Sequence, residues 1–174
     1  ARRMGAMVEG FDVRAAAREQ VESLGARFVA IDLFAEGEGG YARTLDEAAM
    51  ARLRTALRPK VAASDIVIAT AQIPGKAAPL LISADAVAAM RYGSVLVDLA
   101  IASGGNIAGA TIGETITANG ALIIGEANMP SRYSADASAL LARNLYNFIA
   151  ALNVDGRLDF TREPEIVGPA TICN

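Results

Sequence analysis

Histidine and tryptophan are absent from this 174-residue sequence, and cysteine occurs once. Without histidine the chain can hold no Ser-His-Asp triad, no histidine metal ligand and no imidazole acid or base. A single cysteine, Cys173, excludes an internal disulfide and fits a reducing compartment. We therefore predict no catalytic side chain and no metal site in these residues, so that a cofactor or a partner has to supply the chemistry.

Charge and long apolar runs are also scarce. Charged residues make up 20% of the chain, the formal net charge is -3, and the basic residues are scattered. Because no basic stripe is present to neutralise phosphates, a nucleic-acid partner is not expected. No apolar run reaches the roughly 20 residues of a bilayer-spanning helix, so direct membrane insertion of this chain is not expected either. Apolar residues, at 53%, suffice for the core of one domain.

Short apolar runs alternate with amphipathic stretches along the chain. Strands are predicted at 6–12, 27–31, 65–70, 94–99 and 121–125, and helices at 15–24, 44–57, 83–90 and 135–152. This alternation predicts an α/β fold with a doubly wound parallel sheet. The run 65–70 has apolar residues on both of its faces, which is typical of a central parallel strand.

Local signals mark the ends of several elements. Residues 44–47 form a capping box that opens a helix, and Pro59 predicts a break or kink near its end. Asn119 and Gly120 predict a tight turn before the strand at 121–125. The residues after Asn153 are polar and weakly patterned.

The first residues predict the end of a helix, with Gly5 as its cap, leading into the first strand. A doubly wound nucleotide-binding domain has a strand and a Gly-rich turn before such a helix. We therefore expect an N-terminally truncated domain, with residues 1–152 forming most of it. We expect residues 153–174 to form a C-terminal tail that returns toward a missing N-terminal domain.

Asp12 ends the first predicted strand. An acidic residue at this point of the fold accepts hydrogen bonds from the adenosine ribose and repels a 2′-phosphate, which favours NAD over NADP. A turn aspartate that caps the next helix explains the residue equally well. Arg14, two residues later, could meet a phosphate and weaken that preference.

Polar or small residues follow three later strands, at 70–75, 98–100 and 128–131. An aspartate such as Asp98, at the end of a buried strand, is costly unless it meets a helix N-terminus, water or a ligand hydroxyl. Capping explains any one of these segments alone, whereas three successive strand ends indicate a ligand crevice. The Gly-rich loop 36–43 lies on the same side in this fold; it could cover a nucleotide, although an ordinary surface turn is the more common explanation.

Taken in order, eight motifs resemble one family: 3–6, 12–14, 19–25, 39–42, 70–75, 93–100, 104–106 and 130–132. They are similar to the NAD(H)-binding, Rossmann-like domain of the proton-translocating NAD(P) transhydrogenase alpha subunit, from residue 2 to at least residue 152. Alanine dehydrogenase is the relative with the same fold. Alanine dehydrogenases typically carry an aspartate where this chain has Ala102.

The resemblance implies an oxidoreductase component that presents NAD(H) to NADP(H) held by a partner domain, with direct hydride transfer between the two rings. Other domains of such an enzyme span the membrane and couple the exchange to proton translocation. The implied location is the cytoplasmic face of the inner membrane, as a peripheral domain, and the implied assembly is a homodimer. By itself this chain is expected to be inactive.

The resemblance also assigns cofactor contacts to matching positions. Asp12, Val13 and Arg14 would hold the adenosine ribose, and Gly40 and Tyr41 would lie in a loop that closes over NAD(H). Five residues would line the stretch from pyrophosphate to nicotinamide: Thr70, Ala71, Gln72, Asp98 and Leu99. Asn128, after the next strand, completes the predicted set. Gln72 stands where leucine is common, and the loop before Gly39 is shorter than usual.

Two other functions stay open from the sequence. One is an alanine dehydrogenase-like, NAD-dependent oxidoreductase, which residues upstream of Ala1 would reveal by a substrate lysine and histidine. The other is a non-catalytic NAD-binding module, which would bind NADH without passing hydride to an NADP(H)-binding partner.

Overall fold

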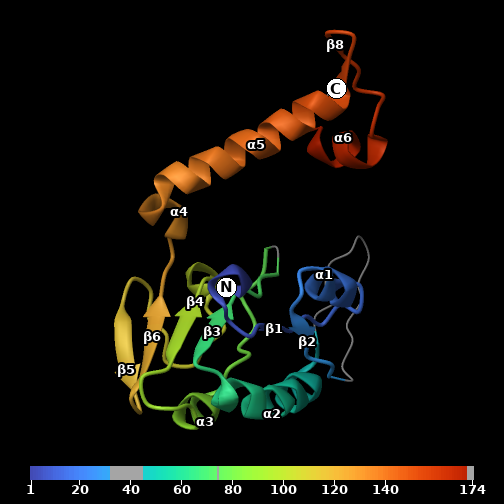
Figure 1. The fold of residues 1–174 in the computed structure, drawn as a ribbon. Coiled ribbons are helices and arrows are strands. Elements are labelled where there is room, and N and C mark those ends of the chain that lie inside the picture. Colours follow the sequence, from blue (N-terminus) through green and yellow to red (C-terminus); the bar gives the residue numbers. More distant parts are fainter. Residues whose placement is uncertain (32–44, 74, 172–174) are drawn as a thin grey trace. The chain divides into compact units, whose positions relative to one another are not determined.

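The computed structural model describes residues 1–31, 45–73 and 75–171. Their contacts divide the chain into two compact units, Ala1–Ala127 and Asn128–Asn174. The first unit contains the sheets that the sequence predicts, and it has the parallel, doubly wound character expected of them (Figure 1). The division falls before the last long helix, which belongs with the C-terminal residues.

A four-stranded sheet with the order β3-β4-β6-β5 forms the centre of the first unit. Its parallel strands are β3 (Ile66–Ala69), β4 (Val95–Asp98) and β6 (Ala121–Gly125), and Ile66, Val95 and Leu122 are in register. The fourth strand, β5 (Thr115–Ala118), is antiparallel to β6 across the turn predicted at Asn119 and Gly120. The sequence analysis missed this strand.

A separate parallel pair consists of β1 (Glu9–Gly10) and β2 (Arg27–Phe28), joined by α1 (Ala17–Ser23). Both strands are shorter than the runs 6–12 and 27–31 that the sequence predicts. A short 3-10 helix, η1 (Arg2–Met4), precedes β1 and ends at Gly5 with a positive φ of 86°, as expected for a glycine cap.

Two α-helices and one 3-10 helix follow: α2 (Glu47–Ala63), α3 (Ala84–Ala88) and η3 (Ile101–Ser103). The N-cap of α2 is Asp46, whose carboxylate accepts a hydrogen bond from the Ala49 amide at 2.7 Å. Pro59 lies inside α2 and does not end it, so the predicted break is wrong. We attribute this to the buried face of Leu53, Leu57 and Val61, whose packing outweighs the lost backbone hydrogen bond.

The core lies on one face of the four-stranded sheet. Ala69, Leu96 and Ile123 from the strands pack with Val61 of α2 and Val87 of α3, all of them buried. On the opposite face, Ile66 and Ile68 of β3 are 66% and 61% exposed. The expectation that β3 is buried on both faces is therefore wrong for one face.

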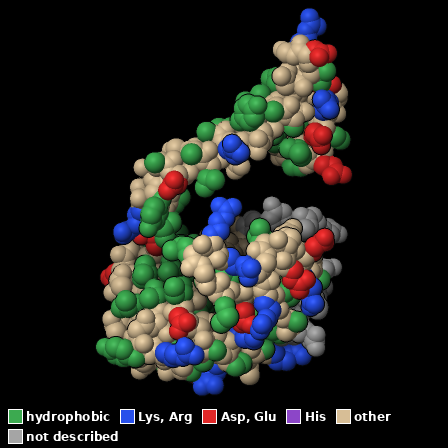
Figure 2. Space-filling view, viewed as in Figure 1, with side chains coloured by type: hydrophobic (Ala, Val, Ile, Leu, Met, Phe, Trp, Pro, Cys, Tyr) green, Lys and Arg blue, Asp and Glu red, His purple; other side chains and the backbone are tan. Residues whose placement is uncertain are grey.

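The second unit begins with α4 (Met129–Arg132) and α5 (Ser134–Leu152), which confirms the predicted helix at 135–152. The tail is more ordered than its sequence pattern indicates, with the hairpin β7 (Asn153–Val154) and β8 (Arg157–Leu158) followed by α6 (Pro164–Ala170). Large hydrophobic side chains of α5, among them Leu141, Leu145 and Phe148, are exposed within this unit (Figure 2). Among the described residues, no helix is long and apolar enough to cross a membrane.

Candidate functional site

Asp98, the last residue of β4, is fully buried, and its carboxylate accepts hydrogen bonds from the backbone that follows the strand. The amide of Ala100 donates to Oδ1 at 3.0 Å, and the amides of Asn106 and Ile107 donate to Oδ2 at 2.7 and 2.9 Å. Such donors stabilise a buried carboxylate without a cation. The predicted ligand hydroxyl is therefore not needed to explain this aspartate, and its contact with a cofactor stays a prediction.

Asn106 joins the loop after β4 to the loop after β3. Its side-chain nitrogen donates to the carbonyl oxygens of Ala71 and Pro79 at 3.0 and 2.8 Å, and its side-chain oxygen accepts from the Ala71 amide at 2.9 Å. One fully buried carboxamide thus holds both backbone polar groups of Ala71. The sequence analysis treated this asparagine as part of a flexible turn and missed its contact with Ala71.

The chain between Ala71 and Ile82 is bound to the segment around Asn106 by further backbone hydrogen bonds. The carbonyl oxygen of Asn106 accepts from the amides of Leu81 and Ile82, each at 2.9 Å, and that of Ser103 accepts from Ala78 at 2.7 Å. Because these bonds span more than twenty residues of sequence, the two loops form one layer at the carboxyl ends of β3 and β4.

Glycine makes the close approach to Asp98 possible. Gly105 has a positive φ of 84°, and a Cβ atom there would lie 2.9 Å from Oδ2 of Asp98. The glycines that the sequence analysis treated as a flexible turn are therefore part of a fixed structure at this position.

Five of the predicted cofactor contacts gather in this layer. Thr70 and Gln72 are exposed beside the partly buried Ala71, and the Gln72 side chain donates to the Leu99 carbonyl at 3.3 Å. The amide of Leu99 in turn donates to Ala69 at 2.9 Å, at the end of β3. Thr70, Ala71 and Gln72 thus lie against Asp98 and Leu99, as expected for one side of a crevice.

Asp12 and Arg14 form a second predicted group, just after β1. The Arg14 side chain donates from Nε to Oδ1 at 3.0 Å and from Nη2 to Oδ2 at 2.8 Å, and its amide donates to Oδ1 at 2.9 Å. Burial raises the pKa of Asp12, but the hydrogen bonds and charge of Arg14 lower it further, below its ordinary value of 3.8. The carboxylate is therefore ionised at neutral pH. Val13, between them, is partly buried.

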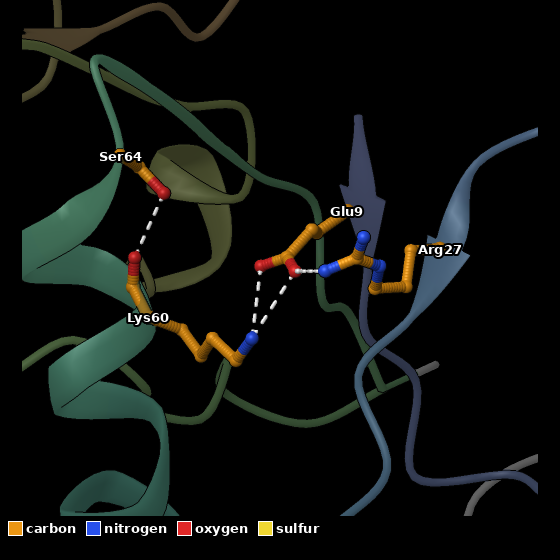
Figure 3. Close-up of polar contacts among 4 residues, drawn as sticks. All are labelled: Glu9, Arg27, Lys60 and Ser64. Carbon is orange, nitrogen blue, oxygen red and sulfur yellow. Dashed lines mark hydrogen bonds and ion pairs between the residues drawn. The ribbon is translucent and has the colours of Figure 1, made fainter. Parts of the chain in front are cut away.

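An ion-pair cluster links β1 to the end of α2, which leads into β3. Nζ of Lys60 donates to both carboxylate oxygens of Glu9, at 3.1 and 3.3 Å, and Arg27 of β2 lies 3.6 Å from the same carboxylate (Figure 3). Ser64 donates to the Lys60 carbonyl at 2.8 Å. These contacts connect the β1-β2 pair to the entrance of β3.

The remaining predicted residues do not join these groups. Gly40 and Tyr41 lie outside the described residues. Asn128 belongs to the second unit, where it is the N-cap of α4 and its side chain accepts from the Ser131 amide at 3.3 Å. No group of three or more potential metal ligands occurs in the described part of the chain.

Comparisons with known proteins follow the same lines. The sequence model of a family described as "Alanine dehydrogenase/PNT, C-terminal domain" matches residues 1–174. The chain is 45% identical over 153 residues to an NAD(P) transhydrogenase alpha subunit of Rhodospirillum rubrum, covering 86% of this chain and 40% of that protein. The chain thus spans less than half the length of this relative.

Solved structures agree. The crystal structure of transhydrogenase from Sinorhizobium meliloti matches with a TM-score of 0.68 at 38% identity, covering 95% of this chain and 44% of that one. An L-alanine dehydrogenase matches with a TM-score of 0.61 at 26% identity, covering 87% and 38%. The predicted transhydrogenase resemblance and the Rossmann-like fold are thereby confirmed, and the chain belongs to the alanine dehydrogenase/PNT C-terminal domain family.

Proposed function

We propose that this chain is the NAD(H)-binding part of a transhydrogenase alpha subunit, which passes hydride between NAD(H) and NADP(H) held by a partner domain. The observation that supports this most is the 45% identity to a transhydrogenase alpha subunit over 86% of the chain. By "complete subunit" we mean the longer polypeptide that, on this proposal, contains these residues. Its membrane domain, proton coupling, homodimeric assembly and place at the cytoplasmic face of the inner membrane belong to the same proposal.

The described residues fit an NAD-type dinucleotide. A carboxylate can accept about four hydrogen bonds, and Arg14 supplies three to Asp12, so acceptor capacity on Oδ2 is left for a ribose hydroxyl. The Asp12 side chain is 28% exposed, which makes that capacity reachable. At the carboxyl ends of β3 and β4, the exposed Thr70 and Gln72 provide a polar edge for the rest of the cofactor.

Hydride exchange suits the side chains that are present. The nicotinamide ring, when bound, carries the hydride, and the protein has to orient it and exclude water. No histidine is available in the sequence to act as an acid or base. The exposed methyl group of Ala102 in η3 stands where alanine dehydrogenases typically carry an aspartate, and this favours exchange between nucleotides over amino-acid oxidation.

We further propose that one strand of the complete subunit lies between β1 and β3. Among the described residues β1 pairs with β2 and β3 with β4, so each leaves one edge without a partner strand. Both pairs are parallel, and the contact of Glu9 with Lys60 holds β1 beside the entrance of β3. A central parallel strand followed by a Gly-rich turn would complete the sheet and supply the helix N-terminus that receives the pyrophosphate.

The experiment that tests the function mixes the NADH-loaded complete subunit with an NADP-binding partner domain and follows a single turnover by absorbance. The expected result is stoichiometric reduction of NADP, with no reduction of NAD by L-alanine and no ammonia release in a parallel assay. Reduction of NAD by L-alanine would instead establish the dehydrogenase alternative. Tight NADH binding without either reaction would establish a non-catalytic module.

A further inference from the structure

Asp98 and Asn106 are both fully buried polar residues at the carboxyl ends of the parallel strands, and both have all their described polar contacts within the protein. A buried, ionisable residue facing only backbone amides has no exposed atom for a ligand. It does have a chain of contacts toward residues that are exposed. The chain runs from Asp98 to the backbone of Asn106, and from the Asn106 carboxamide to Ala71.

We propose that Asp98 and Asn106 are positioning residues for the nicotinamide-side half of the cofactor, acting through Ala71 and not by touching the ligand. The inference rests on the proposed function, since it assumes that residues 70–72 border the dinucleotide. Asp98 fixes the backbone of Asn106 through the 2.7 Å bond to its amide. Asn106 then holds Ala71 on both its amide and its carbonyl oxygen, at 2.9 and 3.0 Å.

This arrangement fixes the residues on either side of Ala71. With its backbone held at two points, Ala71 cannot rotate its peptide groups without breaking buried hydrogen bonds, and each such loss leaves a buried polar group unsatisfied. Thr70 and Gln72 are therefore presented at the end of β3 in one geometry. The third bond of the carboxamide, to Pro79 at 2.8 Å, extends the same constraint to the far end of the loop.

The adenosine end of the site provides an internal control. Asp12 and Arg14 lie after β1, and their hydrogen bonds with each other do not involve Asp98 or Asn106. If Asp98 and Asn106 position only the nicotinamide-side half, their replacement weakens NADH binding and leaves AMP binding unchanged. A general loss of folding would weaken the binding of both ligands.

The test uses the complete subunit with Asp98→Asn, Asn106→Asp and the double variant, and measures dissociation constants for NADH and for AMP. Asn106→Asp removes both side-chain donations to Ala71 and Pro79, and Asp98→Asn turns one acceptor oxygen into a donor that faces a backbone amide. Leu53→Ala is the matched control, because Leu53 is fully buried in α2 and takes no part in these contacts. We expect each site variant to weaken NADH binding at least tenfold and AMP binding less than twofold, and Leu53→Ala to change neither by more than twofold.

The double variant tests whether the two residues act through one route. If they do, its loss of NADH affinity does not exceed that of the more severely affected single variant by more than about twofold. Losses that multiply, site variants that bind NADH like the wild type, or equal losses for AMP and NADH would overturn the proposal. Wild-type subunit that binds no NADH would overturn the proposed function instead.

A milder change keeps the proposal testable if these variants do not fold. Gly105→Ala removes no hydrogen-bonding group but places a Cβ atom 2.9 Å from Oδ2 of Asp98. The proposal predicts a loss of NADH affinity of about threefold or more with AMP affinity retained. Unchanged NADH affinity in a folded Gly105→Ala subunit would contradict it.

Discussion

Arg14 holds the carboxylate of Asp12 at both oxygens, with Nε 3.0 Å from Oδ1 and Nη2 2.8 Å from Oδ2. The sequence analysis treated the two residues as competing influences on cofactor choice, one repelling a 2′-phosphate and one attracting it. Their contact shows that they act as one unit, in which the arginine keeps the aspartate ionised and fixes its orientation.

Cofactor preference follows from this pair. The complete subunit is expected to bind NADH more than tenfold better than NADPH, a difference of at least ~1.4 kcal/mol. Asp12→Asn removes the charge that repels a 2′-phosphate and is expected to bring the two affinities together, as measured by fluorescence titration. Glu9→Gln, which removes a nearby carboxylate that faces Lys60 instead, serves as the control and should keep the preference. Equal wild-type affinities would contradict the role of Asp12.

The same pair makes a prediction about acid. The pKa of Asp12 is lower in the folded protein than its ordinary value of 3.8, so its contribution to stability is complete above that value and is lost as the pH falls through the folded pKa. We expect wild type to exceed Asp12→Asn in unfolding free energy by up to about 1 kcal/mol near neutrality. Urea unfolding between pH 7 and pH 3 should show this difference shrinking below about pH 4. A difference that grows on acidification would contradict the assignment.

Gly125, the last residue of β6, is predicted to tolerate no side chain. A Cβ atom there would lie 2.1 Å from the Thr111 carbonyl oxygen, which belongs to the backbone and cannot rotate away. Gly125→Ala should lower the free energy of unfolding by roughly 2 kcal/mol or more, as overpacking does in well-packed sites. Gly168→Ala, where no atom lies within 4 Å of the added carbon, is the control and should change stability by less than about 1 kcal/mol. Equal stability of the two variants would contradict the packing described for β6.

Residues 1–174 by themselves are predicted to bind NADH weakly. If a strand and a Gly-rich turn of the complete subunit lie between β1 and β3, the chain alone lacks the helix N-terminus that receives the pyrophosphate. Calorimetry should then give an affinity at least tenfold lower for the chain than for the complete subunit. Equal affinities would show that β1 and β3 need no strand between them for binding.

The sequence predicted the elements of the fold that depend on local pattern. The apolar runs at β3, β4 and β6 and the turn at Asn119 were correct because each is written in neighbouring residues. The strand β5 was missed, since Thr115 and Thr117 alternate with only two apolar residues and four residues give little periodicity. The exposure of Ile66 and Ile68 could not be predicted either, because the pattern shows that a face is apolar and not what covers it.

The site was predictable in its outline and not in its connections. Strand ends directed attention to Asp98 and to residues 70–72, but Asn106 lies 35 positions from Ala71, and no local pattern links them. The available signal was an asparagine after two glycines, soon after an aspartate that ends a buried strand. That combination indicates a tight turn around a carboxylate, although it does not identify the partner loop.

Direct transfer between the two nicotinamide rings is the central claim, and isotope labelling tests it most directly. NADH carrying deuterium at the transferred C4 position would be bound to the complete subunit, mixed with NADP on its partner domain, and the NADPH formed would be analysed by mass spectrometry. Because the chain has no histidine to exchange a proton with water, the account predicts that the deuterium is recovered quantitatively in NADPH. Unlabelled NADPH, with the deuterium released to solvent, would contradict it.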